Sequence, residues 1–165
     1  MQVSHTRSAV SSIFDDPNLV ASAGLVPAMG LAQKSGLGTL LDEHLTVPGY
    51  YGANAGLKMS ALIAGMLAGA DSIDDMGLLR HGAMDKIFTG TYAPSTLGSF
   101  LRAFTFGHVR QLDAVASRWL PALAATAPIT TGIDELALVD IDDTIKATYG
   151  YHKQGTGLAI AVSRV

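Results

Sequence analysis

Residues 136–157, LALVDIDDTIKATYGYHKQGTG, combine a strand-like apolar run with closely spaced aspartates. Because alternate side chains of an extended strand share a face, we expect Asp140 and Asp142 side by side near its end. Two unpaired carboxylates would repel each other and resist removal from water. A divalent cation such as magnesium or manganese would resolve this conflict, since both ions prefer oxygen ligands. The alternative interpretation is an ordinary solvated turn built on the Asp-Asp-Thr sequence.

The composition around this segment is that of a globular chain. Its 165 residues suffice for one domain of ordinary size, or for a small domain with part of another. Apolar residues make up 48% and charged residues 15%, which excludes disorder over the whole length and suggests a fragment or a subunit with a large interface. The formal net charge of −3 provides no global attraction to nucleic acid, so any DNA contact must come from a local patch.

Nothing in the sequence indicates an oxidising compartment or a membrane. Cysteine is absent, which excludes disulfides and thiolate metal sites. The N-terminus lacks the basic and apolar regions of a signal peptide. The most apolar segment, residues 56–70, is too short to cross a bilayer and contains Lys58. We therefore expect a cytoplasmic protein with no membrane partner.

Residues before position 127 have helical spacing, and residues after it resemble strands. Residues 57–68 are apolar on nearly every face, which predicts a helix buried at the centre of a bundle. Residues 20–45 indicate two short helices, broken by Gly24, Pro27 and Gly36. A longer helix is expected over 108–126, with Pro121 kinking it or ending its regular part. Its apolar stripe would contain Leu112, Ala116, Trp119, Leu120 and Leu123.

The segment PSTLGSFLRAF, residues 94–104, is the best candidate for a DNA contact. Ser95 or Thr96 is a plausible helix N-cap, and the N-terminus of a helix attracts phosphate. An apolar stripe would fix the helix to its neighbours: Leu97, Phe100, Leu101 and Phe104. The polar side would be lined, as in a recognition helix, by Ser95, Thr96, Ser99 and Arg102. The alternative is an amphipathic helix whose polar face only contacts water.

Three blocks of the sequence together resemble the DDE transposases of bacterial insertion sequences. They are GADSIDDMGLLRHGAM (69–84), PSTLGSFLRAFTFGHVRQLDAV (94–115) and VDIDDTI (139–145), and the resemblance extends over residues 20–157. It implies a mainly α-helical region, residues 1–130, that binds the terminal inverted repeats of the element. Residues 131–165 would then form the first one or two strands of an α/β ribonuclease-H-like core.

The resemblance also implies roles for individual residues. Asp142, two positions before Thr144, would be the first of three acids that hold two Mg²⁺ or Mn²⁺ ions for phosphoryl transfer. Asp140 and Asp143 are not assigned as ligands. Lys153, in a turn after the second strand, would contact a DNA phosphate. The implied partners are the DNA repeats and other transposase subunits, in a homo-oligomer or a hetero-oligomer with full-length chains.

The sequence departs from the family pattern after Gly157, where LAIAVSRV stands in place of an aromatic and glycine-containing strand. The second aspartate and the glutamate of the catalytic triad are missing from these residues. We therefore expect a truncated transposase that is inactive alone, because one carboxylate cannot hold two ions that each need several oxygen ligands. The alternatives are a non-catalytic fragment that binds or blocks DNA ends, and a pseudogene product without a function.

Overall fold

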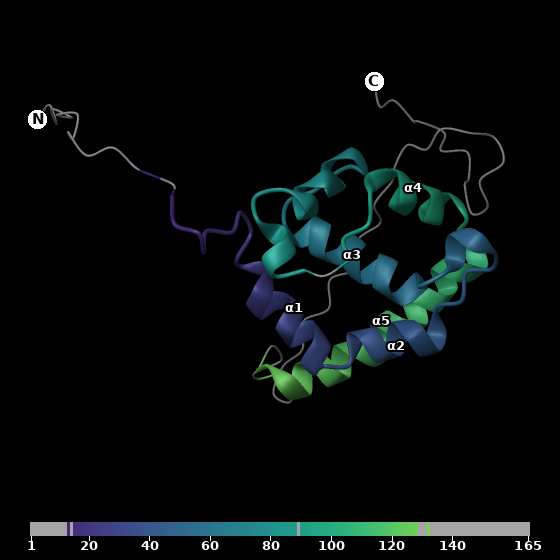
Figure 1. Cartoon of the computed structure of the whole chain (residues 1–165). Helices are drawn as coiled ribbons and strands as arrows, with labels where there is room; N and C mark the ends of the chain where they lie inside the picture. Colours follow the sequence, from purple (N-terminus) through teal and green to yellow (C-terminus); the bar gives the residue numbers. More distant parts are fainter. Residues whose placement is uncertain (1–12, 14, 89, 129–131, 133–165) are drawn as a thin grey trace, which may run out of the picture.

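The computed structural model describes residue 13 and residues 15–88, 90–128 and 132. These residues form a mainly helical bundle in which no strand occurs (Figure 1). Its α-helices are α1 (Leu25–Lys34), α2 (Leu37–His44), α3 (Ala55–Leu67), α4 (Pro94–Arg102) and α5 (Phe106–Thr126). Three 3-10 helices connect them: η1 (Tyr50–Gly52), η2 (Asp74–Arg80) and η3 (Met84–Lys86). The helical character expected before residue 127 is confirmed, whereas the strands expected in 131–165 lie outside the described residues.

Helix α3 runs through the middle of the bundle and contacts α1, α2, α4 and η2. Figure 1 shows it with α4 on one side and with α2 and α5 on the other. The side chains of Met59 and Leu62 are buried in the core. However, three apolar side chains of α3 are exposed to solvent: Leu57 at 63%, Met66 at 60% and Leu67 at 58%. The prediction of burial on nearly every face was therefore wrong for the first turn and the C-terminal end of this helix.

Helices α1 and α2 follow the apolar spacing of the sequence, with one correction. Gly36 has a φ of 80°, a left-handed conformation that glycine adopts without steric cost, and it separates the two helices as expected. Pro27 does not break α1, because it is the third residue of the helix. A proline is tolerated there, since the first turn has no intrahelical acceptor for the missing N–H group.

Helix α5 packs against α2 and α1 and begins with a capping box. The Thr105 backbone N–H donates to His108 Nδ1 at 2.8 Å, while the Thr105 side chain accepts from the backbone of His108. The helix continues through Pro121 to Thr126, so the prediction that this proline ends the regular part was wrong. Proline inside a helix removes one hydrogen bond but does not prevent the neighbouring turns from forming.

The apolar face of α5 is rotated relative to the expected stripe. Val115 is buried, and Leu112 and Trp119 pack against the core. Leu120 is 57% exposed and Ala116 is also exposed, so neither belongs to the buried face. Trp119 Nε1 donates to Ser35 Oγ at 2.7 Å, which joins α5 to the end of α1.

Candidate nucleic-acid interface

Helix α4 begins two or three residues earlier than an N-cap at Ser95 or Thr96 implied. Pro94 is its first residue, and the extended residue Ala93 is its N-cap without a side-chain hydrogen bond. The prediction that Ser95 or Thr96 caps the helix was therefore wrong. Proline favours the first helical position because its fixed φ matches the helix and its missing N–H would have no partner there. Ser95 and Thr96 consequently occupy the second and third positions, where both are exposed.

Two backbone N–H groups of the first turn of α4 have hydrogen-bond acceptors within the same segment. The amides of Thr96 and Leu97 both donate to the carbonyl oxygen of Ala93, at 3.0 and 3.1 Å. Pro94 has no N–H, so the Ser95 amide is the remaining backbone donor of the turn. The positive end of the helix thus presents one amide and two hydroxyl groups to solvent, an arrangement that favours an anion.

The opposite side of α4 fixes the helix in the bundle. Leu97 and Phe100 are 1% and 0% exposed, and the Phe100 ring meets the Phe104 ring edge-to-face at 5.0 Å. The expected apolar stripe is confirmed for these three residues, whereas Leu101 is 37% exposed. This anchoring holds the polar side of α4 in a defined orientation.

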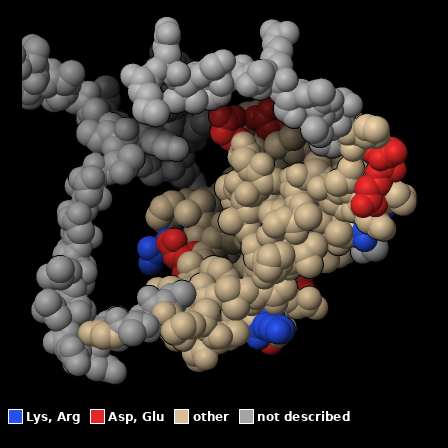
Figure 2. Space-filling model, turned by 90° about the vertical axis from the view of Figure 1, so that its left-hand side faces the viewer, with Lys and Arg blue, Asp and Glu red and all other residues tan. Residues whose placement is uncertain are grey.

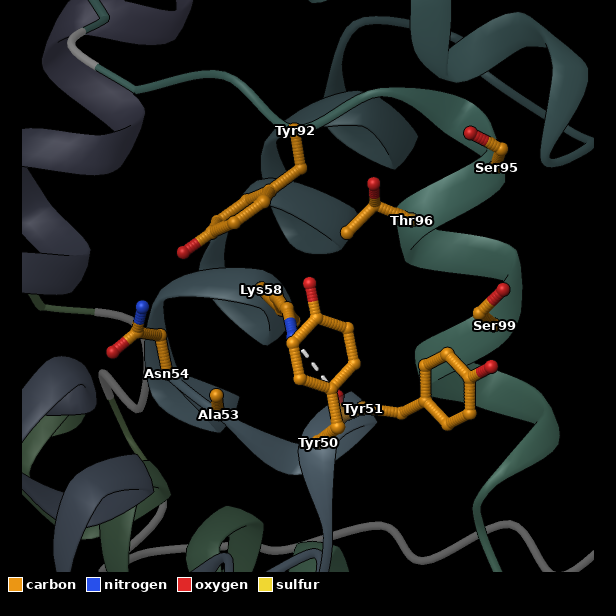
Figure 3. A pocket seen from close by; sticks show the side chains of 9 residues that line it. All are labelled: Tyr50, Tyr51, Ala53, Asn54, Lys58, Tyr92, Ser95, Thr96 and Ser99. Carbon is orange, nitrogen blue, oxygen red and sulfur yellow. Dashed lines mark hydrogen bonds between the residues drawn. The ribbon is translucent and has the colours of Figure 1, made fainter.

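The polar side of α4 forms one wall of an open cleft of about 380 Å³, shown in Figure 3. We call it the α4 cleft. Its α4 wall consists of Ser95, Thr96 and Ser99. The remaining lining residues are Tyr50, Tyr51, Ala53, Asn54, Lys58 and Tyr92. Within the described part of the chain, the lining therefore contains one cation, three phenol rings and several hydroxyl groups, and it contains no carboxylate.

Lys58 lies at the base of the α4 cleft and is only 5% exposed. Its Nζ donates to the backbone carbonyl of Tyr51 at 2.9 Å and lies 5.7 Å and 5.5 Å from the ring centroids of Tyr92 and Phe100. Buried lysines are usually paired with a carboxylate, yet none forms an ion pair with Lys58 within the described part of the chain. An ammonium group has three N–H donors, and the hydrogen bond to Tyr51 uses one of them. Lys58 can therefore also donate to an anionic ligand in the cleft.

Two exposed tyrosines on η1 also line the cleft. Tyr50 and Tyr51 are 89% and 55% exposed, and their rings meet at 75° with centroids 5.8 Å apart. Gly52 is the last residue of η1 and lies against the backbone of Val47. A Cβ at this position would overlap the carbonyl oxygen of Val47. Gly49 precedes it with a φ of 79°, in the left-handed region. The two glycines thus determine where the tyrosines lie.

The structure brings three of the sequence-predicted DNA contacts together and places a fourth beside them. Arg102 is exposed and donates from Nη2 to Ser99 Oγ at 3.0 Å, but it does not line the cleft. Asp142 and Lys153 lie outside the described residues. The sequence interpretation missed Lys58 and the tyrosines. The signals that pointed to them were a single lysine in an apolar helix and the sequence GYYG at 49–52.

Charge elsewhere on the surface is sparse. Figure 2 shows a face dominated by uncharged side chains, on which Lys and Arg form small separate groups instead of a continuous basic band. In the described part of the chain, no three His, Asp or Glu residues lie close enough together to hold a metal ion. No helix among these residues is both long and apolar enough to span a bilayer.

Comparison with protein-family models, with curated proteins and with solved structures finds no match to this chain. The interpretation of the α4 cleft therefore depends on its own chemistry and on the sequence motifs.

Proposed function

We propose that the helical bundle is the DNA-end-binding region of a DDE transposase of a bacterial insertion sequence. In this proposal the polar side of α4 contacts the phosphate backbone of the terminal inverted repeat. The observation that carries it is the α4 cleft itself, where Ser95, Thr96 and Ser99 share a wall above the buried Lys58. The three motif blocks that resemble these transposases supply the link to DNA ends.

The chemistry of α4 suits a phosphate oxygen. Ser95 and Thr96 present hydroxyl groups at the positive end of the helix, and Arg102 adds an exposed guanidinium two turns later. Lys58 contributes a nearby positive charge that no acid in the described residues neutralises. Because the chain as a whole carries a net charge of −3, this local arrangement would have to provide most of the attraction.

The catalytic part of the proposal rests on the sequence resemblance alone. We propose that Asp142 is the first ligand of a two-metal centre with Mg²⁺ or Mn²⁺, and that Lys153 contacts a phosphate nearby. The cellular setting we propose is the bacterial cytoplasm, with the element's DNA and other transposase subunits as partners. An Asp142→Asn substitution should then leave DNA binding by the helical bundle unchanged, because the proposed role of Asp142 is to bind metal and not the terminal repeat.

A salt titration of DNA binding tests the proposal directly. Fluorescence anisotropy would compare a duplex carrying a terminal repeat with a scrambled duplex of equal length. We expect tighter binding to the repeat, and a logarithm of affinity that falls linearly with the logarithm of salt concentration. The Arg102→Ala variant should reduce the magnitude of this slope by about 1 if Arg102 contacts one phosphate.

Arg118→Ala is the matched control, since Arg118 is an exposed arginine on α5 that lies outside the cleft. Its salt slope should equal that of the wild type. Absence of duplex binding at low salt would overturn the proposal. Equal affinity for the repeat and the scrambled duplex would remove the assignment to element ends.

A further inference from the structure

We propose that the α4 cleft holds a single unpaired nucleotide of the bound DNA. Its base would lie against the tyrosine rings of η1, and its phosphate would lie against Lys58 and the first turn of α4. This inference rests on the proposed function, because it assumes that the ligand belongs to DNA. It assigns a role to the two tyrosines of η1, which the phosphate contact alone does not use.

The position of Lys58 points to a ligand that enters the cleft. At 5% exposure, its ammonium group is out of reach of a phosphate on a duplex that lies across the mouth. A single nucleotide can reach it, since a cleft of about 380 Å³ is within the size range of small-molecule sites. Figure 3 shows the Lys58 amino group beside the Tyr50 ring, with Ser95, Thr96 and Ser99 beyond that ring in this view.

The tyrosines offer surfaces for a base. Tyr50 is 89% exposed and Tyr51 is 55% exposed, although large aromatic side chains are usually buried. Proteins that bind single-stranded nucleic acid stack unpaired bases on such rings. Because the two rings are inclined at 75°, one base can stack on only one of them, and the other ring would border its edge.

The α4 side of the cleft is suited to the phosphate of the same nucleotide. Ser95, Thr96 and Ser99 line it, and in Figure 3 the Ser99 hydroxyl points away from the Tyr51 ring, while it accepts a hydrogen bond from Arg102. Among the described residues, no carboxylate lines the cleft, so none of these residues repels an anion. Exposed aromatic rings, hydroxyl groups and a buried cation that line one cleft match the base and the phosphate of one nucleotide.

The test compares DNA probes that differ only in their ends. The full chain would be titrated with a blunt terminal-repeat duplex, the same duplex with a three-nucleotide single-stranded extension, and free dAMP. We expect the extended duplex to bind about 5- to 150-fold more tightly than the blunt one, the range expected for stacking of one base. A 2-aminopurine in the extension should change its fluorescence on binding.

Two substitutions at one exposed position separate stacking from folding. Tyr50→Phe keeps a ring and should retain the preference for the extended duplex. Tyr50→Ala should lose the preference and the fluorescence change, because it removes the ring on which the base would stack. Because Tyr50 is 89% exposed, neither change should affect folding.

The outcomes distinguish the two proposals. Equal binding of blunt and extended duplexes, or free dAMP binding as tightly as the extended duplex, would overturn the unpaired-nucleotide site and leave the proposed function intact. Failure to bind any duplex would overturn the proposed function and this inference with it.

Discussion

The ammonium group of Lys58 donates a hydrogen bond of 2.9 Å to the backbone carbonyl of Tyr51, and it thereby joins the central helix α3 to the η1 loop. Burial of a lysine removes its charge from water, which costs free energy unless other groups compensate. Here a carbonyl oxygen and the faces of Tyr92 and Phe100 provide part of that compensation. The bundle thus keeps a cation in its interior at the base of the α4 cleft.

Replacing this cation should affect ligand binding more than stability. We expect Lys58→Met to leave the free energy of unfolding unchanged or raised, because an apolar side chain of similar length avoids the desolvation of a buried charge. Affinity for the terminal-repeat duplex with the single-stranded extension should fall about tenfold or more, the value of one charge-assisted hydrogen bond. Urea denaturation and anisotropy measure the two effects. Lys86 is an exposed lysine outside the cleft, so Lys86→Met should change neither the stability nor the DNA affinity. A large loss of stability in Lys58→Met would contradict this account.

The close approach of Gly52 to Val47 predicts a large difference between two Gly→Ala substitutions. Gly52→Ala should destabilise the fold by about 1–3 kcal/mol, because the added Cβ overlaps the carbonyl oxygen of Val47 and η1 must shift. Gly38→Ala lies inside α2 with open space around it and should stabilise by about 0.5–1 kcal/mol. Thermal denaturation followed by circular dichroism measures both. Similar values for the two variants would show that η1 is not held in this position.

The hydrogen bond between Trp119 and Ser35 predicts an energetic coupling between α5 and α1. Ser35 is 4% exposed, and its Oγ accepts from Trp119 Nε1 at 2.7 Å. Ser35→Ala should cost about 1–3 kcal/mol, since it leaves the indole N–H without its partner. In a double-mutant cycle with Trp119→Phe, we expect a coupling of about 0.5–1.5 kcal/mol by urea denaturation. Ser117 is an exposed serine of α5, so the free energy of unfolding of Ser117→Ala should stay within about 0.5 kcal/mol of the wild-type value. A coupling energy of zero in the double-mutant cycle would refute the contact between Trp119 and Ser35.

Asp75 predicts a change in stability with acid. The Ser72 hydroxyl and the Ser72 backbone N–H donate to Asp75 Oδ2 at 2.6 and 3.1 Å, and these bonds, the hydroxyl bond first, hold the pKa of Asp75 below its ordinary value. A lowered folded-state pKa contributes stability above the unfolded-state pKa, and this contribution disappears as pH falls through the folded-state value. The stability difference between the wild type and Asp75→Asn should therefore shrink on acidification.

Nuclear magnetic resonance titration of the Asp75 carboxyl provides the matched measurement. Ser72→Ala removes the hydroxyl donor and should raise the pKa of Asp75 toward its ordinary value. An unchanged titration in Ser72→Ala would show that the hydroxyl does not cause the shift.

Periodicity in the sequence predicted the anchoring face of α4 correctly. Leu97 and Phe100 lie three residues apart, so any helix over this segment places them on one side. The cap was predicted wrongly because Ser95 and Thr96 are good N-cap residues, and the preference of Pro94 for the first helical position outweighed theirs. Local preferences compete over a few residues, and the sequence alone did not rank them.

Tertiary packing explains what periodicity missed elsewhere. The buried face of α5 contains Val115 in place of Leu120, because its direction depends on how α5 lies against α2. Lys58 is buried only because α4 and η1 close over α3 at that point, and no pattern within α3 reveals those neighbours. The α4 cleft brings together residues 50–58 with residues 92–99, so its composition required the fold.

The most direct test of the central claim places a carboxylate on the α4 wall. Thr96 and Thr39 are both exposed threonines at the third position of a helix, and only Thr96 lines the cleft. A glutamate at this position favours the helix dipole by about 0.3–1 kcal/mol, so neither substitution should destabilise the fold. Anisotropy with a terminal-repeat duplex at low salt should show Thr96→Glu binding about tenfold or more weakly than Thr39→Glu, because the carboxylate would repel phosphate. Equal affinities of the two variants would contradict the assignment of α4 as the DNA contact.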